Sequence, residues 1–214
     1  MDGDLANKQL GGTARQKLLN AALLLIRTKG YTSTTVDDLC DEAGVTKGAF
    51  FHHFKSKEAL AIAAADYWSQ MTAAFFEGAP YHKHKDPLDR VLGYIDFRRA
   101  ILRGKVPAFT CLVGTMVQEV YEIYPAIREA CDASISAHAA TVEADIAQAI
   151  KRHGIRTKWT AHSLALHMQA VLQGAFVLAK TKHDAAVAVE TVDHLRRYVE
   201  LLFQSAKRKG KEGS

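Results

Sequence analysis

The chain has 214 residues, 48% of them hydrophobic and 24% charged, with 14 Gly and 4 Pro, which excludes a disordered or collagen-like protein. No apolar run approaches the roughly 20 residues of a membrane helix, and residues 1–12 contain no signal-peptide stretch, so we expect a soluble, cytoplasmic protein of one or two domains. The net charge is +5, and residues 5–36 hold five basic side chains and no acid, which indicates either a polyanionic partner at one end or simply a solvated face.

Apolar side chains recur at helical spacing along almost the whole chain, and alternating apolar and polar runs are few. This pattern predicts an all-α protein of about nine helices, with Thr or Ser as N-caps and Gly or Pro at the breaks. The predicted helices cover residues 14–29, 36–43, 47–54, 57–76, 87–102, 110–121, 125–154, 158–180 and 184–207. Residues 78–85, which begin with Gly-Ala-Pro, are predicted to form a loop between two regions.

Residues 34–57 read TTVDDLCDEAGVTKGAFFHHFKSK and contain two short predicted helices joined at Gly44 and Val45. Such a turn needs a Gly that can adopt a positive φ, and the crossing of the helices needs a small residue, here Cys40. The apolar residues spaced for burial between the two helices are Leu39, Ala43, Val45 and Phe50. The spacing therefore predicts a helix-turn-helix, in which Cys40 packs as a small apolar group.

The second of these short helices has the features of an element that reads nucleic acid. Its first residues are small or polar, its N-terminus carries partial positive charge, and residues 46–57 contain three lysines and no acid. Thr35 and Lys57 begin the flanking helices and are placed to contact the sugar-phosphate backbone. The alternative is an ordinary helical hairpin with a solvated polar face.

The run GYTSTTVDDLCDEAGVTKGAFFHHFKSKEAL, residues 30–60, resembles the DNA-binding domain of TetR-family transcriptional regulators. The shared features are a Gly-aromatic pair after the first helix, a Thr-Thr cap, the AGVTKG turn, an aromatic-aromatic-x-His-Phe ending and the KSKEAL entry into a fourth helix. In that family the third helix enters the major groove. The resemblance therefore implies DNA contacts here by Thr46, Lys47, Gly48, Ala49, Phe51, His52 and His53.

One position departs from the family pattern, because Phe51 stands where the family usually has a Tyr whose hydroxyl meets a phosphate. The phenyl ring keeps the packing and can contact a thymine methyl, but it cannot form that hydrogen bond. The resemblance further implies that His52 faces DNA and that His53 is partly structural. A metal site at this histidine pair is not expected, because ligands on one helix need a spacing of about four residues.

We expect three regions: a helix-turn-helix domain at 1–56, a helical ligand-binding and dimerisation domain at 57–207, and a basic tail at 208–214. The resemblance implies a small-molecule pocket surrounded by the middle helices, residues 87–153. The candidate lining residues are Tyr67, Met71, Phe75, Tyr94, Phe97, Phe109, Cys111, Met116, Tyr121, Trp159 and His167. The alternative is that they are core, the commoner role of aromatic residues at helical spacing.

The segment PAFTCLVGTMVQEV, residues 107–120, resembles one in the N-ethylmaleimide-responsive branch of the TetR family, where a cysteine can react with electrophiles. Cys111 falls on that cysteine, and Thr110 replaces the Gly that usually precedes it. A packed apolar cysteine is the alternative. The three cysteines of the chain, at 40, 111 and 131, cannot all pair and match no common zinc spacing, so we expect reduced thiols.

The last two predicted helices carry apolar stripes with the spacing of helical bundles, at intervals of 4, 3, 4 and 3 in residues 164–178 and 3, 4 and 3 in residues 192–202. The resemblance implies a homodimer paired through these helices, and a helix-turn-helix usually binds DNA as a pair on two half-sites. The predicted interface residues are Leu164, Met168, Val171, Gly174, Ala175, Leu178, Val192, Leu195, Val199 and Leu202. An intramolecular core built from the same stripes is the alternative.

The sequence contains no GxGxxG, P-loop, HExxH or GxSxG motif and no Glu-x-x-His repeat of a di-iron bundle. We therefore predict no catalytic residue, no metal site and no cofactor, and we assign His82 and His84 to a solvated loop. We predict a repressor that binds a palindromic operator in double-stranded DNA as a homodimer and leaves it when a small molecule binds. The alternative is a helical ligand-binding or enzymatic bundle with a vestigial helix-turn-helix.

Overall fold

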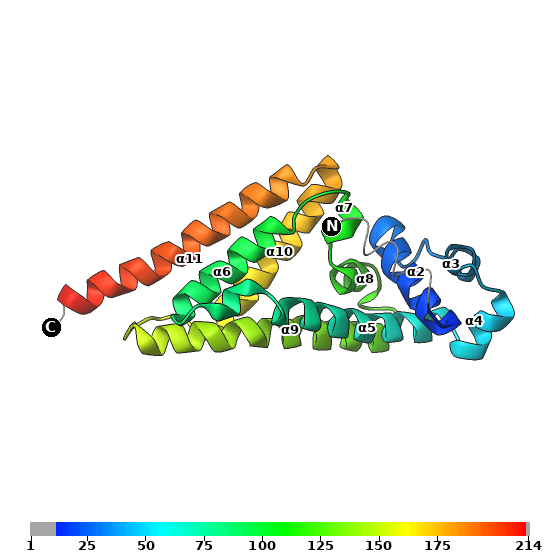
Figure 1. Cartoon of the computed structure of the whole chain (residues 1–214), viewed down its shortest axis with the longest axis horizontal. Helices are drawn as coiled ribbons and strands as arrows, with labels where there is room; N and C mark the ends of the chain where they lie inside the picture. Colours follow the sequence, from blue (N-terminus) through cyan, green and yellow to red (C-terminus); the bar gives the residue numbers. More distant parts are fainter. Residues whose placement is uncertain (1–11, 213–214) are drawn as a thin grey trace. The chain divides into compact units, whose positions relative to one another are not determined.

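The computed structural model describes residues 12–212, with side chains described up to Gln204. This part of the chain consists of ten α-helices and one short 3-10 helix, without a strand, which confirms the expected all-α fold (Figure 1). The elements in chain order are α2 (Ala14–Lys29), α3 (Val36–Ala43), α4 (Lys47–His53), α5 (Lys57–Glu77), η2 (Pro80–Lys83), α6 (Pro87–Ala100), α7 (Val106–Phe109), α8 (Leu112–Val120), α9 (Pro125–Arg152), α10 (Ala161–Lys182) and α11 (Ala186–Glu212).

The first helices begin and end at the capping residues that the sequence indicates. Thr13 accepts a hydrogen bond from the Gln16 backbone N–H at 3.3 Å and so begins α2. Gly30 ends α2 with φ at 88°, and its N–H donates to the Ile26 carbonyl. Helices α2 and α3 have the predicted bounds because their start and stop signals lie within the adjacent four residues.

Several later helices differ from the prediction, α7, α8 and α10 among them. Helix α7 is an additional single turn in the expected connection after α6. Helix α8 begins at Leu112 because the sulfur of Cys111 accepts the N-cap hydrogen bond. Helix α10 begins at Ala161 because Thr160 and Ser163 form a capping box there.

The last helix, α11, continues beyond the predicted end at residue 207 and reaches Glu212. The backbone of the predicted basic tail, 208–214, is therefore helical through Glu212, while its side chains and residues 213–214 lie outside the described part of the chain. Lys8, from the basic stretch near the N-terminus, also lies outside the described residues.

The chain forms two compact units, each made from two separate segments. The first unit contains Met1–Thr72 and Thr110–Ser134, and the second contains Ala73–Phe109 and Ile135–Ser214. Helices α5 and α9 therefore contribute residues to both units. The domain boundary after residue 56 stays a prediction.

In the first unit, α2 packs against α3, α4 and α8. Its apolar stripe is almost completely buried, since Leu18, Leu19, Ala22 and Ile26 are at most 3% exposed. Burial of each larger aliphatic side chain in this stripe contributes about 1.5–3 kcal/mol to folding. Helix α2 is thus the support on which the two short helices α3 and α4 are held.

In the second unit, α11 packs against both α10 and α6, and η2 packs against α6. Tyr94, Ile146, Met168, Val199 and Phe203 are all at most 2% exposed and form part of its core. Within residues 12–212, no helix combines the length and the apolar character needed to cross a membrane.

Candidate functional site

Helices α3 and α4 are joined by a tight turn at Gly44. This residue adopts φ 61° and ψ 42°, a left-handed conformation that strains most residues with a side chain. Its N–H donates to the Asp41 carbonyl at 3.2 Å, at the end of α3. The residues predicted to pack between the helices are buried or half-buried: Leu39, Cys40, Ala43, Val45 and Phe50. The chain therefore forms the predicted helix-turn-helix.

The side chains predicted to contact DNA from α4 gather on its uncovered surface. Phe51 is 56% exposed, although its edge meets the Phe50 ring with centroids 5.1 Å apart. The other exposed residues of the predicted set are Thr46, Lys47, Gly48 and His52, and the half-buried ones are Ala49 and His53. The structure places these residues on α4 and at its N-cap, and their contact with DNA stays a prediction.

Lys47 forms an exposed ion pair with the preceding helix. Its Nζ lies 2.7 Å from Oδ1 of Asp37, and the two side chains are 60% and 64% exposed. The hydrogen bond to Asp37 raises the pKa of Lys47, so this side chain is cationic at neutral pH. An ion pair in water is worth little, so Lys47 can exchange this carboxylate for another anion at small cost.

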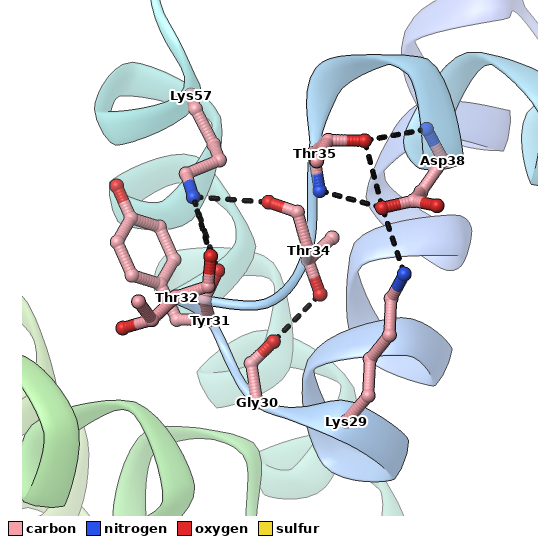
Figure 2. Close-up of polar contacts among 8 residues, drawn as sticks. All are labelled: Lys29, Gly30, Tyr31, Thr32, Thr34, Thr35, Asp38 and Lys57. Atoms are coloured by element: carbon pink, nitrogen blue, oxygen red, sulfur yellow. Dashed lines mark hydrogen bonds and ion pairs between the residues drawn. The ribbon is translucent and has the colours of Figure 1, made fainter.

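A polar network anchors the start of α3 (Figure 2). Asp38 Oδ2 accepts hydrogen bonds from the backbone N–H and the hydroxyl of Thr35, each at 2.7 Å, and lies 2.7 Å from Lys29 Nζ. The hydrogen bond from Lys29, together with those from Thr35, holds the pKa of Asp38 well below its usual range. The Thr35 hydroxyl is thus engaged within its own helix start, and its contact with a DNA backbone stays a prediction.

Lys57, at the start of α5, points into the turn between α2 and α3 (Figure 2). Its ammonium donates to the carbonyls of Tyr31 at 3.1 Å and Thr34 at 2.9 Å, and it lies 4.3 Å from the Tyr31 ring centroid. Burial lowers the pKa of this half-buried lysine. The placement gives Lys57 a structural role that the sequence did not indicate, and its predicted phosphate contact stays a prediction.

Glu119, near the end of α8, binds the same turn. Its carboxylate accepts the backbone N–H of Tyr31 at 3.1 Å and that of Thr32 at 2.8 Å. The approach is close, because a Cβ added to Gly30 would lie 2.3 Å from Glu119 Oε1. Glu119 was not singled out in the sequence analysis. It is the one charged residue of the otherwise uncharged helix α8, and such an isolated charge can indicate a residue with a specific partner.

Replacing Glu119 by Gln is expected to lower the free energy of unfolding by about 1–2 kcal/mol, because one of two charge-assisted acceptors is lost. Glu122→Gln is the matched control, since Glu122 is exposed. That control should change stability by less than about 0.5 kcal/mol. Urea denaturation followed by tryptophan fluorescence compares the two variants, and equal midpoints would show that these contacts do not stabilise the turn.

The predicted pocket residues are divided between the two units. Tyr67, Met71, Cys111, Met116 and Tyr121 belong to the first unit, whereas the remaining six belong to the second. In the second unit, Phe75 lies 5.2 Å from Phe97 between ring centroids, and both Phe97 and Tyr94 contact Phe76 and Tyr81. We call the rings of Phe75, Phe76, Tyr81, Tyr94 and Phe97 the aromatic cluster.

The other three predicted pocket residues of the second unit have different neighbours. Phe109 meets Phe176 at 6.4 Å, and Trp159 meets Phe203 at 5.7 Å between ring centroids. His167 is exposed on α10, beside Tyr198 of α11 at 5.1 Å. A ligand contact by any of the predicted pocket residues stays a prediction.

Cys111 caps α8 and is half-buried. Its sulfur accepts the Gly114 backbone N–H at 3.4 Å. Cys40 and Cys131 are buried, and burial raises the pKa of Cys131 to about 12, so neither is a ready nucleophile. All three are free thiols, and a reaction of Cys111 with electrophiles stays a prediction.

A polar group that the sequence analysis missed lies next to the aromatic cluster. His138 Nε2 on α9 is 2.9 Å from the Tyr94 hydroxyl, and the Gln169 amide of α10 donates to the same hydroxyl at 3.4 Å. Burial lowers the pKa of His138 to about 4, and the charge of Arg98 adds to the effect. His138 is therefore neutral at neutral pH and can accept a hydrogen bond from the Tyr94 hydroxyl.

The apolar stripes of α10 and α11 face mainly into the second unit. The stripe residues at most 3% exposed are Leu164, Met168, Ala175, Val192, Leu195 and Val199. Val171 and Leu202 are half-buried, whereas Gly174 is exposed and Leu178 is 44% exposed. For these six buried residues, the placement favours a role in the core of the protomer, the alternative to a dimer interface that the apolar spacing left open.

Part of the uncovered surface of the same two helices is nevertheless apolar. Val177 and Leu178 of α10 are 40% and 44% exposed, and Tyr198 and Leu201 of α11 are 44% and 62% exposed. Gly174 has no atom within 4 Å of an added Cβ, so a second helix can approach α10 closely there.

In residues 12–212, no cluster of His, Cys, Asp or Glu is arranged to hold a metal ion.

Comparison with known proteins gives two family matches that together span most of the chain. Residues 18–64 match bacterial regulatory proteins of the tetR family, and residues 87–207 match the tetracyclin repressor-like C-terminal domain. The second match alone covers more than half of the chain. Both matches are to transcriptional regulators, a class of proteins that are generally not enzymes.

Individual relatives agree with these matches. The chain is 38% identical over 58 residues to the regulator YerO of Bacillus subtilis, covering 27% of this chain and 20% of YerO. It is 25% identical over 186 residues to an uncharacterised HTH-type regulator of Lactococcus lactis, covering 85% of this chain and 91% of that protein. A solved TetR regulator of Chloroflexus aurantiacus superposes with a TM-score of 0.75 at 28% identity, over 87% and 94% of the two chains. The chain therefore belongs to the TetR family of DNA-binding transcriptional regulators.

Proposed function

We propose that this regulator is a homodimeric repressor that places α4 in the major groove of each half of a palindromic operator and is released by a small molecule. The observation that carries the proposal is the uncovered surface of α4, which presents Lys47, Phe51 and His52 while Phe50 anchors the helix in the core. The alternative of a ligand-binding or enzymatic bundle is not favoured, because both family matches are to regulators.

The residues of α4 divide by chemistry into three roles. Lys47 supplies a mobile cation for a phosphate, because its present partner is an exposed carboxylate. Thr46 and His52 can exchange hydrogen bonds with base edges, and Phe51 can contact a thymine methyl. Gly48 and Ala49 let the backbone approach the duplex closely. Thr35, His53 and Lys57 complete the proposed set at the borders of the helix-turn-helix.

The proposed release requires a ligand that binds one arrangement of the dimer more tightly than the arrangement that fits DNA. A difference of about 1–3 kcal/mol between the two arrangements changes operator affinity about 5–150-fold. The ligand is proposed to bind in the second unit, where the aromatic cluster adjoins the polar group of Tyr94, His138 and Gln169.

The DNA-reading role is tested with duplex DNA taken from beside the gene of this protein. Lys47→Ala should weaken binding to every duplex by about 1 kcal/mol and reduce the slope of log K against log salt by about one. Thr46→Ala and His52→Ala should change the preference between duplexes. Binding is measured by fluorescence anisotropy over a salt series.

Lys151→Ala is the matched control, because Lys151 is exposed on α9 in the second unit. It should leave affinity and salt slope unchanged. Unchanged binding in all three α4 variants would reject α4 as the reading helix.

The dimer is proposed to form through the uncovered surface of α10 and α11, which includes Gly174 and Leu178 from the predicted interface together with Val177, Tyr198 and Leu201. Leu201→Glu should weaken dimerisation by at least about 2 kcal/mol, because it puts a charge into an apolar contact. Leu24→Glu, at a 41% exposed leucine of α2, is the control. Sedimentation velocity should show monomers for Leu201→Glu alone, and a monomeric wild-type protein at micromolar concentration would contradict the proposal.

A further inference from the structure

Among the described residues Arg98 forms no ion pair, whereas four other arginines of the second unit, Arg152 included, do. Arg90, Arg99 and Arg196 lie 2.6–2.7 Å from the carboxylates of Asp145, Asp193 and Asp96, respectively. Arg98, on α6, is half-buried and has no carboxylate and no hydrogen-bond acceptor among the described residues. In the part of the chain that the structure describes, no carboxylate oxygen therefore lies within 4 Å of its guanidinium.

The guanidinium of Arg98 is placed between two phenyl rings. Its Cζ lies 5.1 Å from the ring centroid of Phe76 and 5.6 Å from that of Phe176. Aromatic faces attract a cation, but they leave the N–H donors of the fork without acceptors. A half-buried guanidinium in this condition favours an anion that supplies acceptor oxygens.

The polar groups near Arg98 do not supply that anion. Burial raises the pKa of Tyr81 and of Tyr94, so both phenols are neutral, although the charge of Arg98 opposes the shift. His138 is also neutral at neutral pH. These three side chains can donate or accept hydrogen bonds, and none of them carries a negative charge at neutral pH.

We propose that Arg98 binds the carboxylate of an apolar monocarboxylic acid, with Phe76 and Phe176 packing against the apolar body of the ligand. This inference rests on the proposed function, since that acid would be the effector of the repressor. A carboxylate is favoured because its two oxygens match the planar fork of one arginine. A phosphate dianion is disfavoured, because the adjacent Arg99 is already paired with Asp193.

The experiment uses the full-length protein with octanoate and 3-phenylpropanoate as probes and octanamide and 3-phenylpropanamide as uncharged controls. Binding is measured by calorimetry and by the rise in Tm, which a ligand of the native state produces. At least one acid should bind the wild-type protein, and its amide should bind at least about tenfold more weakly.

Arg98→Met keeps the apolar stem and should weaken binding of the acid at least about tenfold, whereas Arg98→Lys should be intermediate because it keeps charge without the fork. Arg99→Met, at the neighbouring paired arginine, should bind the acid as the wild type does. The inference is overturned if neither acid binds, if acid and amide bind equally, or if Arg98→Met binds the acid as tightly as the wild type.

Operator binding by the ligand-free protein is measured on the same preparations. If the wild-type and Arg98→Met proteins bind DNA equally, the variant is folded and its loss of acid binding is specific. If the wild type binds no DNA, the proposed function fails, whereas the calorimetric comparison of acid and amide still decides whether Arg98 binds a carboxylate.

Discussion

Phe50→Ala is expected to destabilise the protein by about 3–5 kcal/mol and to abolish specific DNA binding at 37 °C. Phe50 is 0% exposed and is the buried residue of α4, a helix of seven residues. A helix this short is not stable by its own hydrogen bonds and depends on packing for its place. Removing the ring leaves a cavity beneath α4 and frees the helix from the core.

Chemical denaturation followed by circular dichroism measures the loss of stability. Phe51→Ala is the matched control, because the adjacent ring is 56% exposed and its removal should cost less than about 1 kcal/mol. The control should instead change DNA affinity or preference. A Phe50→Ala protein as stable as the control would show that α4 is held by other contacts.

The stability of the second unit is expected to fall as the pH is lowered from about 6.5 to about 4. His138 has a pKa of about 4 in the folded protein, and an unfolded histidine titrates near 6.5. Between these values the unfolded chain binds a proton that the native state excludes, so acid favours unfolding. The slope is about 1.4 kcal/mol per pH unit, and the total loss is about 3 kcal/mol.

The contribution of His138 is isolated by comparison with His138→Gln, which cannot titrate but can still accept a hydrogen bond from Tyr94. Asp38 and Asp86, whose pKa values are lowered in the folded protein, also lose stabilising charge in acid. The wild-type protein and His138→Gln both contain these aspartates, so their effect is the same in the two pH profiles. His167→Gln makes the same substitution at an exposed histidine outside this polar group and is the control for the substitution itself. Parallel profiles for the wild type and His138→Gln would contradict the expected titration.

The helix-turn-helix could be predicted almost residue by residue because its signals are local. Thr35 and Asp38 cap α3 across three positions, and Gly44 supplies the left-handed turn that ends it. The burial of Leu39 and Phe50 follows from apolar spacing within one or two helical turns. The surface of α4 is then the remaining face of the same short helix.

The contacts that place this motif were not predictable in the same way. The phosphate contact expected of Lys57 stays a prediction, and the sequence did not indicate that its ammonium donates to the carbonyls of Tyr31 and Thr34. Glu119 binds the same turn from a helix that the sequence did not connect with it. Composition and spacing could not show that Lys57 and Glu119 both bind this turn, because a lysine or glutamate at a helix end is usually solvated.

The amino-acid pattern was sufficient to predict the all-α class, the bounds of the first helices and the residues of the helix-turn-helix. These features depend on caps, turns and apolar spacing, which act over about four residues. Three-dimensional packing decided which apolar residues of α10 and α11 are core and which remain exposed, and it left Arg98 without a carboxylate. The physical reason is separation along the chain: the hydrogen bonds of Glu119 join residues 87 and 88 positions apart. Such pairs exist only once the helices have packed.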